Sequence, residues 1–420
     1  ELLQFNGYLP TSNIERSDIA ILNTCNIREK ASEKLYSDLG RLSIFKENKR
    51  KLGKKMHIIV TGCVAQAEGK EILKRNKGVD YIFGPQNFHQ LPKILRENET
   101  RKVHNDFLYE EKFKSFIPTT KKAVSKLVTI QEGCDKFCSF CVVPYTRGAE
   151  FSRSVEDIYA EVNSLVNNGA KEITLLGQNV SSYKSNIFKS GIEEAVNLAK
   201  LCKVLSEISK LQRIRYLTSH PIDIDKQLIR EHKINSKLMP FLHLPIQSGS
   251  NKILKEMNRK HDKNFYLDLI SKIKNENKNM AFSSDFIVGY PGENEKDFEE
   301  TLEVIEKVKF ASSYSFKYSD RPGTPAAISK KNIEEDIANK RLKKIQELLN
   351  SQQREFNLSF LDRTVEVLFI NEGKKNNQFV GRTPHLQPVH VISKKNIIGE
   401  LRKVKINNLT SFSFHGELKD

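Results

Sequence analysis

The sequence lacks the features that would place a protein in a membrane or outside the cell. Its 420 residues contain no apolar run near the ~20 residues that a transmembrane helix needs. No secretory signal pattern is recognisable, and only six cysteines are present. These absences argue against a membrane partner and against a disulfide-rich secreted scaffold. We therefore expect a cytoplasmic protein, in which clustered cysteines serve metal binding or catalysis.

Acidic residues are scarce relative to basic ones. The chain has 52 Asp and Glu against 69 Lys and Arg, which gives a formal net charge of +17. An excess of this size favours a polyanionic partner, above all a nucleic acid. A composition bias toward lysine and asparagine, visible in KENKRKLGKK at 46–55, explains the same charge without a partner. Charge alone leaves both interpretations open.

The first hundred residues alternate between strand and helix patterns. Apolar runs at 18–25 and 57–63 each end in a cysteine and precede a helical stretch, and a third run covers 79–83. This alternation predicts an α/β fold with a doubly wound parallel sheet. Cys25 and Cys63 then fall at strand carboxyl ends, where such sheets bind ligands and a helix N-terminus favours a thiolate. Both could instead be small apolar core residues.

Two stretches bound this first domain. Residues 1–12, ELLQFNGYLPTS, have the pattern of the second half of a helix that runs into a turn, so we expect further sequence upstream of Glu1. Residues 96–107 show no periodicity and predict a linker. We therefore place the N-terminal domain at 1–105.

From about 120 to 350 the alternation resumes with longer units. Amphipathic helices, such as the one predicted at 154–169, separate most of the candidate strands, and Cys202 lies on the apolar side of another and is assigned to the core. This pattern predicts a partial (β/α)6 barrel at 118–352 with its chemistry at the strand ends. The candidate strands are KLVTIQEG, EITLLGQN, RIRYLTSHP, FLHLPIQSG, MAFSSDFIVGYPG and SYSFKYS.

Short β segments with little helix between them follow residue 355. They are TVEVLFI, QFVGRT, PVHVIS, IIGELRKVKI and TSFSFHGEL. Segments of this length and spacing predict a small β-barrel at 355–420. Such modules often bind nucleic acid, and a structural cap is the alternative.

The segment EGCDKFCSFCVVPYTRG at 132–148 places Cys134, Cys138 and Cys141 within eight positions. A disulfide would use two of the thiols and leave one over. A zinc knuckle would need a fourth ligand, and the loop holds no histidine or fourth cysteine. Iron–sulfur clusters are held by thiolates, and three protein ligands on four irons leave one iron open for a ligand. The loop therefore predicts an iron–sulfur cluster beyond the first barrel strand.

This loop resembles that of the radical S-adenosylmethionine (SAM) superfamily. The spacing C-x3-C-x2-C after the first barrel strand, with the aromatic Phe140 before the last cysteine, is the pattern of that superfamily. The resemblance implies a [4Fe–4S] cluster whose open iron chelates SAM, and cleavage of SAM by one electron to methionine and a 5′-deoxyadenosyl radical. Radical chemistry carried by a cofactor suits C–H bonds that acid–base groups cannot ionise.

Further motifs along nearly the whole chain are similar to those of the methylthiotransferases, and most to the MiaB family of tRNA enzymes. They are VVPYTRG, LLGQNV, LPIQSGS, MNRKH, SSDFIVGYPGE and RPGTPA, with GRTPHLQPVHV resembling the RNA-binding TRAM module. Asp320 stands where the family usually has proline, which affects only the expected local turn. The resemblance implies replacement of C2–H by C–S–CH3 in N6-isopentenyladenosine 37 of the tRNA anticodon loop.

The family also carries an auxiliary [4Fe–4S] cluster on three N-terminal cysteines. Cys25 in LNTCNIREKA and Cys63 in VTGCVAQ match the second and third of them. The first is expected in a segment upstream of Glu1. The resemblance implies that SAM is used twice, as radical source and as methyl donor, and that sulfur comes through the auxiliary cluster.

The resemblance also implies residues that contact the cofactor and the tRNA. Glycines among them would let the backbone approach the ligand, and plain turn chemistry is the alternative for each position. Arg147, Arg259 and Arg321 are candidates for phosphate contacts near the barrel mouth, with solvated surface arginine as the alternative. The implied SAM contacts are Phe140, Gly177, Gln178, Ser219, Gln247, Ser248, Ile287 and Gly289.

We expect a monomer that binds the tRNA anticodon stem-loop and takes electrons from a donor such as flavodoxin or ferredoxin. Two alternatives keep the chemistry and change the target, to threonylcarbamoyladenosine tRNA or to a ribosomal protein. A third alternative, from another class, is a non-catalytic RNA-binding protein stabilised by zinc.

Overall fold

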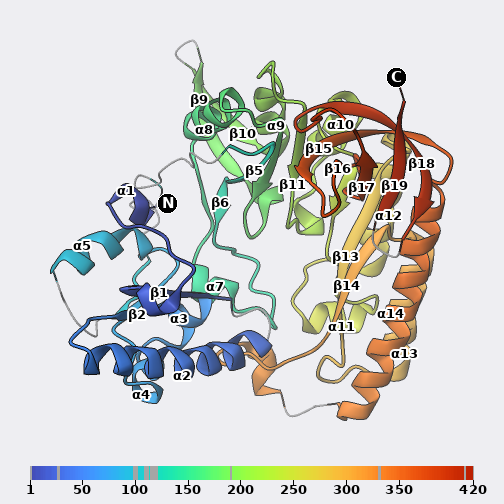
Figure 1. The fold of residues 1–420 in the computed structure, drawn as a ribbon. Coiled ribbons are helices and arrows are strands. Elements are labelled where there is room, and N and C mark those ends of the chain that lie inside the picture. The colour runs from blue at the N-terminus through green and yellow to red at the C-terminus, as the bar shows by residue number, and fades with distance from the viewer. Residues whose placement is uncertain are drawn as a thin grey trace. The chain divides into compact units, whose positions relative to one another are not determined.

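The computed structural model describes residues 2–25, 29–97, 103–107, 113, 122–189, 192–329, 333–410 and 413–419. The chain divides into two compact units. Unit 1 comprises Glu1–Thr119, Gly133–Asp135 and Cys141–Phe151, and unit 2 comprises Thr120–Glu132, Lys136–Phe140 and Ser152–Asp420. Figure 1 labels the elements of both. Within the described ranges, every helix is too short or too polar to cross a bilayer.

Unit 1 is built on a four-stranded parallel sheet in the order β1-β2-β3-β4. Alternate residues of β2 face opposite sides, so that Ile58 and Val60 pack against one set of helices and Ile59 against another. Helices on both faces are the defining feature of a doubly wound sheet, and the predicted fold class is confirmed. The strands are β1 (Ile19–Thr24), β2 (His57–Gly62), β3 (Tyr81–Phe83) and β4 (Val103–His104).

One strand of unit 1 falls where the sequence predicted a linker. Residues 103–104 pair with β3, so the linker prediction for 96–107 is wrong at these two positions. A two-residue strand is too short to show a period of its own and forms because β3 offers it an edge. The helical segments of unit 1 are α1 (Leu2–Phe5), η1 (Ile14–Arg16), α2 (Glu29–Lys51), α3 (Cys63–Glu68), α4 (Lys70–Arg75), η2 (Phe88–Gln90), α5 (Leu91–Glu97) and α7 (Val143–Arg147).

Unit 2 contains the predicted partial barrel. Two three-stranded parallel sheets, in the orders β11-β8-β5 and β12-β13-β14, are linked by a parallel bridge from Ile214 to Leu238. The strands therefore follow one another around the barrel in chain order, as the sequence predicted. They are β5 (Ser125–Thr129), β8 (Glu172–Leu176), β11 (Arg213–Tyr216), β12 (Phe241–His243), β13 (Ala281–Val288) and β14 (Ser312–Lys317).

The barrel helices bury one apolar face against these strands. In α8, Ile158, Val162 and Leu165 are at most 2% exposed, and the side chain of Ser154 caps its N-terminus by accepting from the Asp157 amide. Figure 1 shows α14 running along β14. The helical segments are α8 (Val155–Asn167), η3 (Val180–Ser182), α9 (Leu198–Ser206), η4 (Pro221–Asp223), α10 (Lys226–Ile234), α11 (Asn251–Glu256), α12 (Lys263–Glu276), α13 (Glu295–Val308), η5 (Pro325–Ile328) and α14 (Glu335–Leu358).

Helix α9 carries the cysteine that the sequence assigned to the core. Cys202 is fully buried, and burial raises the pKa of its thiol far above the usual range. The helix begins at Leu198 because the Asn197 side chain caps it by accepting from the Lys200 amide. The preceding residues form a hairpin of β9 (Lys184–Lys189) and β10 (Ile192–Asn197). The remaining short strands near the start of unit 2 are β6 (Gln131–Glu132) and β7 (Phe151–Ser152).

The C-terminal part of unit 2 is a closed five-stranded barrel in the order β15-β16-β17-β19-β18. Closure leaves no exposed sheet edge, and a core around Phe369, Val391 and Phe414 fills the interior. The predicted small β-barrel is confirmed. Its strands are β15 (Thr364–Glu372), β16 (Gln378–Arg382), β17 (Pro388–Ile392), β18 (Leu401–Leu409) and β19 (Phe414–Lys419).

A loop of this small barrel is anchored to β11 by two buried arginines. Arg213 donates from Nη1 to the carbonyl of Arg382 at 2.7 Å. Arg215 donates to the carbonyls of Pro384 and Thr383 at 2.7 and 3.0 Å, and its Nε pairs with Glu172 at 2.8 Å. The two arginines therefore fix the turn between β16 and β17 on the strands of the large barrel.

A buried imidazole makes the stability of unit 2 depend on pH. His232 on α10 is 4% exposed, its Nε2 shares a 2.7 Å hydrogen bond with the hydroxyl of Tyr216, and burial lowers its pKa to about 4. Below about pH 6.5 the imidazole of His232 binds a proton in the unfolded chain, whereas in the folded chain it stays neutral until the pH approaches 4. We therefore expect His232 to reduce the free energy of unfolding by about 3 kcal/mol as pH falls from 6.5 to 4.

The measurement compares thermal unfolding of the parent with that of His232→Gln at pH 7 and pH 5. The amide keeps a polar partner for the Tyr216 hydroxyl but does not titrate. The melting temperature of the parent should fall further from pH 7 to pH 5 than that of the variant. Equal losses in both proteins would show that His232 does not carry this dependence.

Candidate functional site

The three-cysteine loop lies between β6 and α7, and its middle segment is fixed to the barrel of unit 2. The amide of Ser139 donates to the carbonyl of Met257 at 3.1 Å, and its hydroxyl donates to the carbonyl of Glu256 at 2.6 Å. The same hydroxyl shares a 2.9 Å hydrogen bond with that of Tyr290. Phe140 packs against the apolar cluster that contains Met257 and Tyr290. The segment is thus held by α11 and by the turn after β13.

The thiols of this loop differ in burial. Cys138 is 8% exposed, whereas Cys134 and Cys141 are half-buried. Nη1 of Arg259 lies 3.4 Å from Sγ of Cys138. Arg259 is itself only 5% exposed, so the predicted phosphate contact at the surface is wrong for this residue. Its position just after α11 turns it inward, toward the loop.

The donor set fits an iron–sulfur cluster better than a single metal ion. Among the described residues, no group of three or more His, Cys, Asp or Glu side chains is arranged to hold one ion. A four-iron cluster places each thiolate on a different iron, so its ligands need not converge on one point. The inward guanidinium beside Cys138 also supplies the positive charge that a bound thiolate favours. Three thiols in one loop are a donor set that a four-iron cluster takes, and their role as its ligands stays a prediction.

Cys25 and Cys63 follow neighbouring strands of unit 1. The register pairs Thr24 with Gly62, so the two cysteines come directly after partners at the carboxyl edge of the sheet. Cys25 is exposed, and Cys63 is buried at the first position of α3. The half-buried Arg147 donates from Nε to Sγ of Cys63 at 3.3 Å. The edge therefore presents two thiols, and a guanidinium lies beside that of Cys63.

At the end of β8, a glutamine that the sequence analysis missed shapes a predicted cofactor contact. Oε1 of the fully buried Gln131 accepts from the amides of Gln178 and Asn179 at 2.9 and 3.2 Å. A Cβ at Gly177 would lie 2.6 Å from that same oxygen, so a larger residue there would displace the Gln131 side chain from these amides. Gln131 ends the strand motif VTIQ. Its position directly before the cysteine loop is the sequence signal that would have marked it as a residue of the site.

After the end of β11, two buried polar atoms have no hydrogen-bond partner within the described ranges. Ser219 and His220 are 5% and 4% exposed, and Oγ of Ser219 and Nε2 of His220 have no hydrogen-bond partner among the described residues. Burying a polar group without a hydrogen bond lowers the stability of the fold, unless a ligand or a water molecule supplies the bond. Burial, and then the charge of Arg259, lowers the pKa of His220 to about 2, so its imidazole is neutral. Ser219 is thus the predicted contact with an available hydroxyl.

Gln247 and Ser248 follow β12 with different roles. Gln247 has a φ of 80°, a left-handed conformation that is uncommon for a residue with a side chain. Its amide donates to Asp285 and its carbonyl accepts from Ile287, which locks the strained residue against β13. The hydroxyl of Ser248 is instead shared with that of Thr301 on α13 at 3.3 Å. Gln247 and the half-buried Ile287 therefore lie together at the strand ends.

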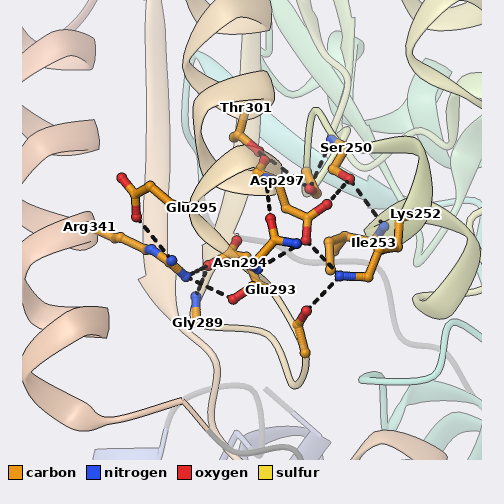
Figure 2. A network of polar contacts seen from close by, with 12 residues as sticks. Ser250, Lys252, Ile253, Gly289, Glu293, Asn294, Glu295, Asp297, Thr301 and Arg341 are labelled. Carbon is orange, nitrogen blue, oxygen red and sulfur yellow. Dashed lines mark hydrogen bonds and ion pairs between the residues drawn. The ribbon is translucent and has the colours of Figure 1, made fainter.

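A buried polar network holds the turn that contains Gly289 (Figure 2). The Gly289 amide donates to Oε2 of Glu293 at 2.7 Å, and Arg341 on α14 donates to the same oxygen at 2.8 Å. Burial raises the pKa of Glu293, although the Gly289 amide and Arg341 act in the opposite direction. Gly289 has a φ of 72°, and its missing Cβ would lie 3.0 Å from that of Ala338.

The same figure shows how α13 joins this network. Asn294 and Asp297 form a capping box at the start of the helix. Asp297 also accepts from the hydroxyl of Ser250 and from Nζ of Lys252, both at 2.7 Å. The turn after β12 and the turn after β13 are therefore fixed to one helix N-terminus. Two of the predicted cofactor segments thus have a common support.

A cavity of about 470 Å³ is lined by residues of β12, β13 and β14, of α14 and of the turn between β16 and β17. Its polar strand residues satisfy one another, since Nδ1 of His243 lies 3.0 Å from the Ser283 hydroxyl and Nε2 lies 3.5 Å from the Asp285 carboxylate. The ring of Tyr314, 58% exposed, stands edge-on to His243. The remaining lining is mixed. It has apolar residues (Leu217, Phe241, Ala311, Leu386 and Pro388) and polar ones (Thr218, Ser312, Gln353, Asn357, Arg382, His385 and Gln387).

Comparison with known families finds matches to two parts of the chain. Residues 128–305 match the radical SAM superfamily. Residues 1–84 match a family described only as uncharacterized protein family UPF0004. A radical SAM methyltransferase from Kitasatospora setae, TsrM, solved with cobalamin and a [4Fe–4S] cluster, has a similar fold. Its TM-score is 0.54 at 11% identity, over 78% of this chain and 68% of that one.

Sequence relatives are similar over the full length. The tRNA-2-methylthio-N(6)-dimethylallyladenosine synthase of Rickettsia conorii is 48% identical, over 100% of this chain and 95% of the relative. The enzyme of the same name from Rickettsia canadensis is 47% identical, over 100% of this chain and 94% of the relative. A [4Fe–4S] cluster and SAM are the cofactors of the superfamily. The chain therefore belongs to the tRNA-2-methylthio-N(6)-dimethylallyladenosine synthase family of radical SAM enzymes.

Proposed function

We propose that the protein replaces the C2 hydrogen of N6-isopentenyladenosine 37 in tRNA by a methylthio group. The observation that carries this proposal is the 48% identity to a synthase of that name over the whole chain. The cysteine loop agrees with it, because the reaction needs radical chemistry at an unreactive C–H bond. Family membership also argues against the zinc-stabilised, non-catalytic alternative.

We assign the radical SAM cluster to Cys134, Cys138 and Cys141. Their support is the thiolate donor set and the position of the loop beyond the first barrel strand. We assign an auxiliary cluster to a ligand set that includes Cys25 and Cys63. Its support is the pairing of Thr24 with Gly62, which makes the two cysteines neighbours. When bound, the clusters and SAM supply the radical, the sulfur and the methyl group.

The residues of the barrel bind and orient the cofactor. Ser219 offers a buried hydroxyl that has no partner in the described part of the chain, and Gln131 holds the amides of the turn after Gly177. Glu293 and Arg341 hold the turn at Gly289, so these strand ends keep their shape before the cofactor arrives. The burial of these residues excludes water, which protects a reactive radical from side reactions.

The cavity lined by β12–β14, α14 and the β16–β17 turn is our candidate for the target base and its isopentenyl group. A base acted on at a ring atom must leave its stack, and aromatic side chains receive such bases. The exposed ring of Tyr314 suits a planar base, and the apolar side chains of Phe241 and Leu386 in the lining suit its apolar substituent. The small C-terminal barrel and the net charge of +17 support phosphate binding.

The partners follow from the substrate. A tRNA substrate places the reaction in the cytoplasm, where flavodoxin or ferredoxin is the expected class of electron donor. Arg321 is half-buried and stays a candidate for a phosphate contact. We expect one chain to bind one anticodon stem-loop.

The test is an assay of anaerobically reconstituted protein with SAM, a reductant and tRNA that carries isopentenyladenosine without the methylthio group. Mass spectrometry of the nucleosides should show the gain of one sulfur and one methyl group for the loss of one hydrogen. 5′-Deoxyadenosine should form in the same reaction. Cluster-loaded protein that gives neither product would refute the proposal.

Parallel reactions separate the alternative targets. Unmodified tRNA, tRNA with threonylcarbamoyladenosine and ribosomes are offered under the same conditions. Methylthiolation of the isopentenylated tRNA alone supports the assigned substrate. Modification of threonylcarbamoyladenosine or of a ribosomal protein instead would keep the chemistry and change the target.

A further inference from the structure

We infer that Arg259 is a positioning residue that sets the reduction potential of the cluster held by Cys134, Cys138 and Cys141. Its guanidinium donates from Nη1 toward Sγ of Cys138 at 3.4 Å. A second nitrogen, Nη2, donates to the carbonyl of Pro245 and so fixes the direction of the first. The inference rests on the proposed function, because it requires that the loop binds a cluster.

Among the residues that the structure describes, the charge of Arg259 has no carboxylate partner. The side chain is 5% exposed, and within the described part of the chain its bonds run to a sulfur and a backbone carbonyl only. Its Nε is buried without any hydrogen-bond partner in that same part. Buried arginines elsewhere in unit 2, such as Arg153 and Arg341, face glutamates at 2.6 and 2.8 Å. An unpaired buried cation is costly, so an anion is expected beside it.

The neighbouring side chains do not supply that anion. His220 and His261 stack edge to face at 5.5 Å, and burial and the charge of Arg259 lower the pKa of each. Both imidazoles are therefore neutral near pH 7. Lys136 is neutralised by Asp223 at 2.8 Å. Arg259 is thus the positive charge that faces Cys138 from this side of the loop.

The thiolate-bound cluster is the anion that fits. Hydrogen bonds to the sulfurs, net charge and burial are the protein's means of tuning the potential of a cluster. Reduction adds one negative charge, and a fixed cation beside a ligand sulfur stabilises that added charge in a site shielded from water. Arg259 should therefore raise the reduction potential of the cluster, so that the oxidised cluster accepts an electron more readily.

The experiment measures the potential of the cluster by a redox titration followed by electron paramagnetic resonance. The protein carries Cys25→Ala and Cys63→Ala, so that the signal comes from one cluster. In this background Arg259→Gln should shift the oxidised-to-reduced ratio at least tenfold toward the oxidised form at a fixed potential, which is 59 mV for one electron. Arg259→Lys keeps the positive charge but loses the two-pronged guanidinium that bonds Cys138 and Pro245 together. Its shift in potential should be in the same direction as that of Arg259→Gln and smaller.

Arg230→Gln is the matched control. Arg230 is an exposed arginine on α10, so the control removes the same charge from the surface of the same unit. It should leave the potential unchanged. If Arg259→Gln takes up no iron, the shift of Arg259→Lys decides the matter alone.

The outcomes separate this inference from the proposed function. If the parent assembles no cluster on the three cysteines, the proposed function fails first. If the cluster forms and the potential of Arg259→Gln equals that of the parent, the inference is wrong. If the potential is unchanged and only the affinity for SAM falls, Arg259 contacts the cofactor, which also overturns the inference.

Discussion

Cys138→Ala abolishes both cluster assembly at the barrel and the cleavage of SAM. A cluster with three protein ligands has none to spare, because its fourth iron must stay open for the cofactor. Cys138 is also the buried thiol of the three, so no water-exposed group can replace it easily. We expect iron and labile sulfide to fall to the amount carried by the auxiliary site, and 5′-deoxyadenosine to fall to background. Cys134→Ala and Cys141→Ala should give the same result.

Cys202→Ala provides the matched control for these losses. It removes a thiol of the same unit that is fully buried in the apolar core around α9. It should lower the free energy of unfolding by about 1 kcal/mol and leave the iron content and the cleavage of SAM unchanged. Full iron content in Cys138→Ala, or loss of iron in Cys202→Ala, would contradict the assignment.

The strands and their polar ends could be predicted from sequence because both are local signals. An apolar run that ends in Cys25 or Cys63 fixes a strand and marks its carboxyl end within a few residues. Parallel topology then follows from the alternation with helices. The same logic located the cysteine loop after the first barrel strand. The closed C-terminal barrel was predictable for the same reason, since its strands are short and regularly spaced.

The supports of the site could not be predicted because they join residues that are far apart in the chain. Gln131 meets Gln178 across 47 positions, and Arg259 meets Cys138 across 121. Nothing in the local sequence distinguishes an arginine that turns inward from one that binds phosphate at the surface. For this reason Arg259 was only a candidate for a phosphate contact from the sequence, and it is found beside a thiol in the fold. The strand β4 was missed on the same ground, because it exists only by pairing with β3.

The pair of Glu293 and Arg341 is the other place where one change has a large effect. Glu293 is 3% exposed and Arg341 6%, and they approach to 2.8 Å. The same carboxylate accepts the Gly289 amide, so it connects α14 to the turn after β13 (Figure 2). Removing one partner of such a pair leaves the other charge buried and unpaired.

Glu293→Ala should therefore lower the free energy of unfolding by about 3–5 kcal/mol. It should also weaken SAM binding, since the Gly289 amide loses its acceptor and the turn is no longer fixed. The measurements are thermal unfolding and the equilibrium binding of SAM to cluster-loaded protein. Glu295→Ala is the control, because that carboxylate pairs with the same Arg341 at 3.1 Å but is 63% exposed. It should cost only about 0–1 kcal/mol.

The double variant Glu293→Met/Arg341→Met distinguishes an unpaired charge from general damage to the turn. Replacement of both members by apolar side chains removes the buried charge, and such replacements are often neutral or stabilising. We expect the double variant to unfold at a higher temperature than Glu293→Ala and to keep its weakened SAM binding, because the acceptor for Gly289 is still missing. If the double variant is no more stable than Glu293→Ala, the loss does not come from the charge of Arg341. If it also binds SAM as the parent does, the turn does not depend on the carboxylate.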